Sequence, residues 1–217
     1  STDVLIAGCE LTANAFRTAL MWNNPIWLCG TPRNDLLFEN DKIELKKKLG
    51  LPLDKKVILF APTFRESIEM SGIYQLKEIN VERLLAILSN KFGGDWCFVF
   101  RSHNLVMARI QDIGLKISPN NIINGNAYDD MAEYLSCTDT LITDYSPDLS
   151  NYRHRERGFY IDINSTPFPV AESFDMLITK IDEFNIAEYQ SRTTEFLSKI
   201  GNVETGKAAE YIVNKLK

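Results

Sequence analysis

Long apolar runs, the usual phosphate-loop motifs and internal repeats are all missing from this sequence of 217 residues. No stretch approaches the roughly 20 apolar residues that a membrane-spanning helix needs. Neither G-x-G-x-x-G nor a Walker A loop occurs, which excludes the common dinucleotide and nucleoside-triphosphate motifs. What remains is an ordinary globular composition, 45% hydrophobic and 24% charged.

An excess of positive charge is also missing. The formal net charge is −5 and the sequence pI is about 5.2, which argues against a nucleic-acid-binding protein that relies on a broad basic face. Arginines and lysines gathered in one cleft can still bind phosphate, because the local field matters more than the net charge. The basic run 46–48 is interpreted as a solvated helix face.

Cysteine pairs of the metal-binding kind are absent as well. The four cysteines are far apart, none forms a C-x-x-C pair, and Cys29 and Cys97 lie inside apolar runs. They are therefore predicted to be buried small hydrophobic residues, and neither a disulfide framework nor a metal site is expected. A reducing, cytoplasmic compartment is the default expectation.

The sequence does contain short apolar runs that alternate with amphipathic helical patterns, which is typical of an α/β fold with a parallel sheet. Strands are predicted near residues 3–8, 26–29, 56–61, 96–101, 121–124, 139–143 and 158–162. Helices are predicted near residues 10–22, 40–49, 80–92, 105–113, 128–137, 171–183, 186–199 and 204–216. Asn80 is a predicted N-cap, and Gly50 and Gly93 fall where helix C-caps are expected.

The alternation fails once, after the predicted strand at 139–143. A parallel sheet needs a crossover before its next strand, but residues 144–157 are polar and turn-rich and lead straight into the run 158–162. Either the last strand is antiparallel or detached, or residues are missing near 146–147. The chain also opens without Met, directly into a strand-like run, so we expect it to be part of a longer protein.

Three predicted strands end in polar side chains, within the segments 58–65, 98–103 and 141–146. In open parallel α/β sheets, ligands bind outside the carboxyl ends of the strands. Reactive and anion-binding side chains at three such ends therefore predict a crevice for a phosphorylated ligand.

Arg101 and His103 are the first of these groups. Two residues apart on an extended chain, they point to the same face at about 6.5–7 Å along the strand. Arginine offers a planar fork for phosphate oxygens, and histidine can donate to phosphate or move a proton. A solvated strand end is the alternative.

Thr63 and Arg65 repeat this geometry, with a simple exposed turn as the alternative. Asp144, Tyr145 and Ser146 lie where a following helix would present free backbone N–H groups, a ready site for an anion.

The segment 30–35 also follows a short apolar run. Gly30 permits close backbone approach, and Pro32 is well placed to open a helical turn. Arg33 and Asp35 are either part of a binding site or an ordinary turn-stabilising pair, and the residues alone favour neither.

Five blocks in this order resemble the CDP-glycerol glycerophosphotransferase family, which includes teichoic-acid polymerases and primases. The family pattern reads G-x-P-R-N-D, A-P-T-[FWY]-R, R-x-H, D-x-L-I-T-D-Y-S-S and R-G-F-Y-x-D. The matching segments here are 30–35, 61–65, 101–103, 139–146 and 157–162. The chain departs from the pattern after Ser146, and it carries Phe168 where the family has the glycine of a P-G-P block.

The resemblance implies a GT-B glycosyltransferase fold with two Rossmann-like domains. It implies that residues 31–217 form the nucleotide-donor-binding domain, and that residues 1–30 are the end of the preceding domain or a linker. The family's catalytic histidine belongs to the other domain, and no residue here matches it. The gap expected near 146–147 coincides with a helix and a strand of the family pattern.

The resemblance further implies transfer of glycerol phosphate from CDP-glycerol to an acceptor hydroxyl, with a lipid-linked polyol-phosphate or glycan acceptor at the inner face of the membrane. Arg101 and His103 are the expected catalytic residues on the pyrophosphate, and no metal or other cofactor is expected. Residues 124–130 are expected near cytosine and ribose. The expected substrate-binding residues are Gly30, Arg33, Asn34, Asp35, Thr63, Arg65, Asp144, Tyr145 and Ser146. The alternatives are a glycosyltransferase that uses a nucleotide sugar and a non-catalytic nucleotide-binding module.

Overall fold

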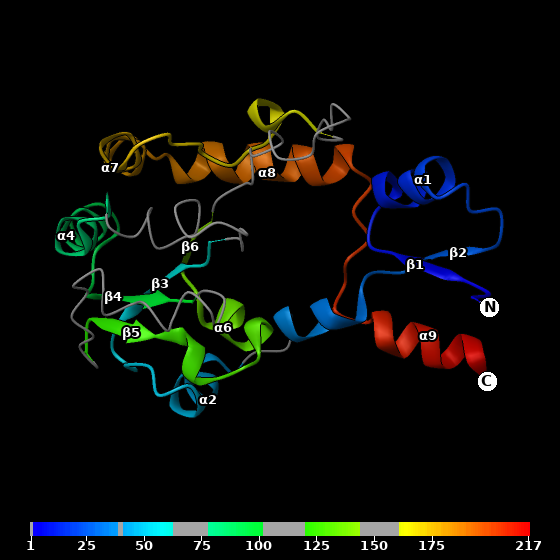
Figure 1. Ribbon diagram of the computed structural model, residues 1–217, viewed down its shortest axis with the longest axis horizontal. Helices are drawn as coiled ribbons and strands as arrows, with labels where there is room; N and C mark the ends of the chain where they lie inside the picture. The colour runs from blue at the N-terminus through cyan, green and yellow to red at the C-terminus, as the bar shows by residue number, and fades with distance from the viewer. Residues whose placement is uncertain (1, 39–40, 63–77, 102–119, 144–160) are drawn as a thin grey trace, which may run out of the picture. The chain divides into compact units, whose positions relative to one another are not determined.

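The computed structural model describes residues 2–38, 41–62, 78–101, 120–143 and 161–217 (Figure 1). The chain divides into two compact units. The terminal unit comprises Ser1–Asp41, Thr166–Phe168 and Asn185–Lys217, and the central unit comprises Lys42–Ser165 and Pro169–Phe184.

The central unit is built on a four-stranded parallel sheet with the strand order β5-β4-β3-β6. The strands are β3 (Lys56–Phe60), β4 (Trp96–Phe100), β5 (Ile122–Asn124) and β6 (Thr140–Ile142). Of these four strands, β3, β4 and β5 lie side by side in the order of the chain. The last one, β6, pairs with the other edge of β3. The first four strands of a Rossmann fold have this order. Successive strands are added on one side of β3 up to β5, and β6 is then added on the other side, so the strand order reverses between β3 and β6.

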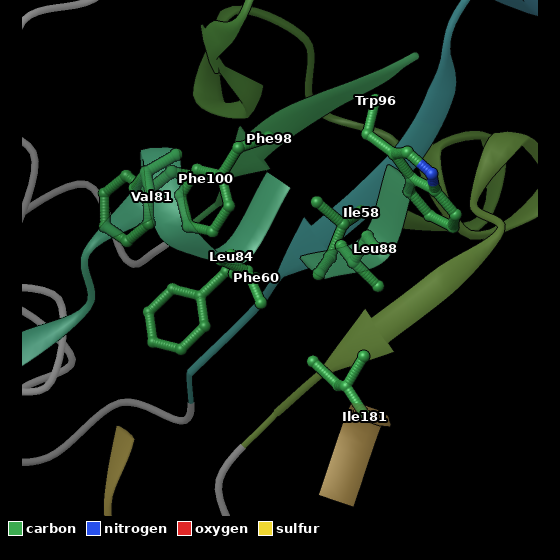
Figure 2. Close-up of a cluster of buried hydrophobic side chains, with 9 residues drawn as sticks. All are labelled: Ile58, Phe60, Val81, Leu84, Leu88, Trp96, Phe98, Phe100 and Ile181. Atoms are coloured by element: carbon green, nitrogen blue, oxygen red, sulfur yellow. The ribbon is translucent and has the colours of Figure 1, made fainter. Parts of the chain in front are cut away.

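The two central strands, β3 and β4, are buried on both faces, which explains why they read as continuous apolar runs. On one face, alternate side chains of the two strands pack against α4 (Val81–Phe92) and α7 (Phe174–Asp182), as Figure 2 shows. The side chains in between pack on the other face against α6 (Met131–Cys137) and the residues that follow α2 (Lys42–Lys48). Helices thus cover both sides of the sheet, as in doubly wound folds.

Local sequence signals set the helix ends. The Asn80 side chain accepts a hydrogen bond from the Arg83 N–H at 3.0 Å and caps α4. Gly93 ends the same helix with φ +68°, and Gly50, after α2, has φ +66°. Both values lie in the left-handed region that glycine adopts without strain. The N-cap predicted at Asn80 and the C-cap predicted at Gly93 are therefore confirmed.

The terminal unit joins the two ends of the chain. Strands β1 (Leu5–Ala7) and β2 (Ile26–Leu28) pair in parallel and are connected by α1 (Glu10–Ala19). The start of α1 bonds to the end of α8 (Ile186–Lys199), since the Glu10 N–H donates to the Gly201 carbonyl at 3.0 Å. The unit also holds the 3-10 helix η1 (Pro32–Leu37) and α9 (Ala208–Leu216). The assignment of residues 31–217 to one donor-binding domain stays a prediction.

The predicted strands from 3–8 to 139–143 are all found, each slightly shorter than expected. The helix predicted at 105–113 and the break at 144–157 lie outside the described residues, as does most of the strand predicted at 158–162. All four cysteines are free; Cys29, Cys97 and Cys137 are buried as predicted, and Cys9 is half-buried. None of the described helices combines the length and the apolar character needed to cross a bilayer.

Candidate functional site

The carboxyl ends of β3 and β6 meet at the point where the strand order reverses. The Ala61 N–H donates to the Ile142 carbonyl at 2.9 Å, and the Thr143 hydroxyl donates to the Ala61 carbonyl at 2.8 Å. Residues 61–62 and 142–143 therefore leave the sheet side by side. In α/β folds of this kind, this position is where ligands bind.

Arg101 brings a third segment to the same edge. It follows β4 directly, and its backbone N–H donates to the Phe60 carbonyl at 2.9 Å. The topology thus places the ends of β4, β3 and β6 on adjacent strands, as the sequence predicted. Several expected site residues lie outside the described part of the chain: Thr63, Arg65, His103, Asp144, Tyr145 and Ser146. Their roles stay predictions.

The Arg101 guanidinium contacts the loop that follows β5. Its Nη1 donates to the Gly125 carbonyl at 2.8 Å and also to the Tyr128 carbonyl, and its Nη2 donates to the Asp129 carbonyl. Its Cζ lies 5.3 Å from the centre of the Tyr134 ring, within the range of a cation–π contact. Burial raises the pKa of the Tyr134 hydroxyl, and the nearby Arg101 charge opposes that shift. The expected contact of Arg101 with pyrophosphate stays a prediction.

The same loop is fixed from within. The Asn124 side chain accepts from the Asn126 N–H at 2.9 Å, and the Asp130 side chain accepts from the Ala132 N–H at 2.8 Å, which caps α6. Gly125 is buried against β4. The segment expected near cytosine and ribose is therefore an ordered loop next to the predicted ligand edge.

Two lysines of the basic run 46–48 are not simply solvated. Lys46 is only 7% exposed and donates to the Lys55 carbonyl. Lys48 Nζ lies 2.7 Å from Glu133 Oε1 and 5.0 Å from the centre of the Tyr128 ring. The hydrogen bond to Glu133 raises the pKa of Lys48. The interpretation of this run as a solvated face was wrong for Lys46, because the run's helical spacing does not reveal which carbonyl lies above it.

A second group of polar side chains lies at the amino ends of the strands. Asp139 accepts from the Val57 N–H at 2.8 Å and pairs with Lys42 at 2.6 Å. It joins β3 to the start of β6, so the first residue of the block 139–146 has a structural contact. An open pocket of about 320 Å³ lies here. Each of its four lysines, Lys42, Lys46, Lys55 and Lys56, already donates to a neighbouring oxygen.

In the terminal unit, the block 30–35 is held by the end of the chain. The Thr31 N–H and the Asn34 side chain each donate to Glu204 at 3.0 Å. Asp35 accepts from the N–H groups of Ala208 and Ala209 at 3.0 and 2.8 Å. Pro32 opens η1 as predicted, and Gly30 has φ +91°.

This block therefore contains side chains with different surroundings. Asp35 binds the amino end of α9, so the alternative of a turn-stabilising pair with Arg33 is not what its described contacts show. Arg33 is exposed. Sequence reasoning missed Glu204, since nothing near residue 204 indicates a partner about 170 positions away.

A metal centre has no candidate among the described residues, where no group of three or more His, Cys, Asp or Glu side chains is placed to hold an ion. The chemistry that the described carboxyl edge offers is hydrogen bonding and positive charge. That suits a diphosphate, whose oxygens accept from N–H and O–H groups.

Comparison with known proteins identifies the family. The family model described as CDP-Glycerol:Poly(glycerophosphate) glycerophosphotransferase matches residues 1–217. The teichoic acid poly(glycerol phosphate) polymerase of Bacillus subtilis (strain 168) is 29% identical over 237 residues, covering 98% of this chain and 31% of that protein. The teichoic acid poly(ribitol-phosphate) polymerase of Bacillus spizizenii is 30% identical over 213 residues, covering 86% of this chain and 32% of that protein.

A solved structure agrees with these relatives. A variant of the wall teichoic acid polymerase TagF, soaked with CDPG, superposes with a TM-score of 0.70 at 28% identity, covering 97% of this chain and 56% of that chain. The chain thus spans 31% of the length of the Bacillus subtilis polymerase and 56% of the TagF chain. The α/β fold with parallel sheets flanked by helices, predicted as the Rossmann-like part of a GT-B glycosyltransferase, is confirmed. The chain belongs to the CDP-glycerol:poly(glycerophosphate) glycerophosphotransferase family.

Proposed function

We propose that this chain supplies the donor-binding half of an enzyme that transfers glycerol phosphate from CDP-glycerol to an acceptor hydroxyl, in the synthesis of a teichoic-acid or capsule-type polymer. One observation carries the proposal. Family-specific segments leave adjacent parallel strands at the point where the strand order reverses, which is where nucleotides bind in Rossmann-like sheets.

The pyrophosphate of the donor would lie outside the ends of β3 and β6. Thr63 and Arg65 follow β3 by a few residues, and Ser146 follows β6 in the same way. A guanidinium, hydroxyl groups and backbone N–H groups together form a cage suited to a dianion. Arg33, exposed in the terminal unit, is the residue of the block 30–35 that we propose for contact with the donor.

The reaction would be an in-line displacement. The acceptor oxygen attacks the β-phosphorus and forms a new P–O bond, while the bond from that phosphorus to the CMP phosphate oxygen breaks. The acceptor proton passes to a base, which the family resemblance places outside these residues. His103 would protonate or hydrogen-bond the leaving phosphate. Catalysis of this kind is mostly positioning and charge stabilisation.

The other partners are proposed from the same resemblance. The acceptor would be a lipid-linked polyol phosphate or glycan, and the work would take place in the bacterial cytoplasm at the inner face of the membrane. Asp144 would orient a glycerol hydroxyl, because a carboxylate repels phosphate oxygens.

CDP-ribitol is the second candidate donor, because one relative is a poly(ribitol-phosphate) polymerase at 30% identity. Glycerol and ribitol differ in length but share the CDP group, so both would use the same nucleotide site. A donor such as a UDP-sugar would bind the same fold, but it would carry uracil in place of cytosine.

Thermal unfolding with matched concentrations of CDP-glycerol, CDP-ribitol, CDP, CMP and UDP-N-acetylglucosamine tests the proposal. A ligand at 100 times its dissociation constant stabilises by about 2.7 kcal/mol. For a chain of this size, we expect CDP-glycerol and CDP to raise the melting temperature by roughly 5–10 °C.

The pattern of shifts decides between the candidates. Stabilisation by CDP and by one polyol derivative over the other identifies the donor. A shift with the UDP-sugar alone would replace the proposal by a glycosyltransferase function. Stabilisation by none of the nucleotides would overturn a donor-binding role for this chain.

A further inference from the structure

The contacts of Arg101 differ from those expected of an arginine that binds phosphate. Three of its N–H groups donate to backbone carbonyls, those of Gly125, Tyr128 and Asp129. An arginine carries five such donors in one rigid plane, so three bonds to one loop fix both the guanidinium and the loop. The side chain thereby ties the end of β4 to the loop 125–129 after β5.

The surroundings of the guanidinium favour the same role. On one side it lies 5.3 Å from the ring of Tyr134, which is only 1% exposed. The loop that it binds is supported separately, since Tyr128 lies under Lys48 and Asp130 caps α6. Gly125 is buried, and a buried carbonyl oxygen left without a donor is costly, so the loop depends on Arg101 to keep its shape.

The position of the loop indicates which part of a donor it would contact. Neighbouring strands lie about 4.8 Å apart, so β5 is about 10 Å from β3 across the sheet. The loop is therefore removed from the reversal point between β3 and β6, where the pyrophosphate is proposed. Its exposed residues are Ala127 and Asp129, and the Asn126 amide is half-buried. A carboxylate and an amide suit a base edge and ribose hydroxyls, and the carboxylate repels a dianion.

Building on the function proposed above, we infer that Arg101 is a positioning residue for the nucleoside part of the donor. It holds the loop 125–129 in a shape that accepts cytidine, and it does not bind the pyrophosphate. This replaces the role that the family resemblance suggested for this residue.

Two substitutions separate these roles. Arg101→Lys keeps the positive charge but cannot span three carbonyls, and Arg101→Ala removes both. Isothermal titration of the 217-residue chain with cytidine, CDP and inorganic pyrophosphate should find cytidine affinity reduced about tenfold or more in both variants. Pyrophosphate affinity should stay at the wild-type value in both. Arg83→Lys, at an exposed arginine on α4, is the matched control.

Hydrogen exchange of the ligand-free chain gives a second, independent measurement. The amides of residues 125–129 should exchange faster in both Arg101 variants and not in the Arg83→Lys control. Circular dichroism melting establishes that the variants are folded.

Either of two results would overturn the inference: unchanged exchange of the loop, or a loss of pyrophosphate affinity with cytidine affinity retained. A wild-type chain that binds no CDP would instead overturn the proposed function, and with it the nucleoside role.

Discussion

At Gly125 the loop after β5 passes so close to β4 that a side chain has no room. An added Cβ would lie 2.9 Å from Val99 Cγ1, 3.0 Å from the Phe100 carbonyl oxygen and 3.2 Å from Arg101 Cβ. The carbonyl belongs to a paired strand, so it cannot move aside as the end of a flexible side chain can. Packing, not backbone conformation, is what requires glycine here.

We therefore expect Gly125→Ala to destabilise the central unit. Overpacking of a filled interior costs about 1–3 kcal/mol, which urea unfolding of the chain measures. Gly50→Ala is the comparison: a Cβ there meets nothing within 4 Å, but the residue has φ +66°, so its cost of about 1–2 kcal/mol comes from the backbone alone. Wild-type stability in Gly125→Ala would mean that the loop takes another path.

At the scale of elements, α9 is capped by a residue distant in sequence. Its own N-cap residue, Lys207, makes no side-chain capping hydrogen bond. The Asp35 carboxylate instead accepts from the first two N–H groups of the helix. Since N–H groups at a helix start lack partners within the helix and carry partial positive charge, a carboxylate there satisfies both needs.

Asp35→Ala should therefore lower the free energy of unfolding by about 1 kcal/mol, within the 0.5–2 kcal/mol found for helix caps. Asp35→Asn, which keeps an acceptor, should cost less. Glu210→Ala removes a first-turn carboxylate of α9 that is exposed, and it is the control. Equal effects of Asp35→Ala and Glu210→Ala in urea unfolding would contradict the capping role.

The features that could be predicted from the sequence depend on neighbouring residues, and those that could not depend on contacts between residues distant in the chain. The strands at 56–60 and 96–100 were predictable because burial on both faces leaves an apolar run, and α4 was predictable because Asn80 and Gly93 signal its ends locally. The bonds of Asp35 to α9 and of Glu204 to Asn34 were not predictable. Periodicity shows which face of an element is buried, but not which distant group lies against it.

At the scale of the whole molecule, the order of the strands explains how distant segments come to share one edge. The sequence predicted a parallel sheet with polar residues at its carboxyl ends. The structure adds that β6 pairs with β3, with Phe60 opposite Ile142. This order puts the ends of β3 and β6, at residues 60–61 and 142–143, next to each other, and sequence spacing alone does not determine it.

The core beneath that sheet also makes stability depend on pH. Burial raises the pKa of the Cys97 thiol to about 11, and burial likewise raises the pKa of Cys137 and of Tyr134 in the same cluster. An unfolded cysteine loses its proton near pH 8.5. Between these values the folded state binds more protons than the unfolded state, so the free energy of unfolding falls as pH rises.

Cys97→Ala should therefore flatten this decline between about pH 8.5 and 11, whatever it does to stability at neutral pH. Urea unfolding of both proteins at several pH values measures the two slopes, and ionisation of other groups cancels in their difference. Val99→Ala, which trims a buried side chain of the same strand that cannot ionise, should leave the slope as in the wild type. If Cys97→Ala retained the full decline, the thiol would have to ionise within the folded protein, which is incompatible with a side chain sealed between β4 and its neighbours.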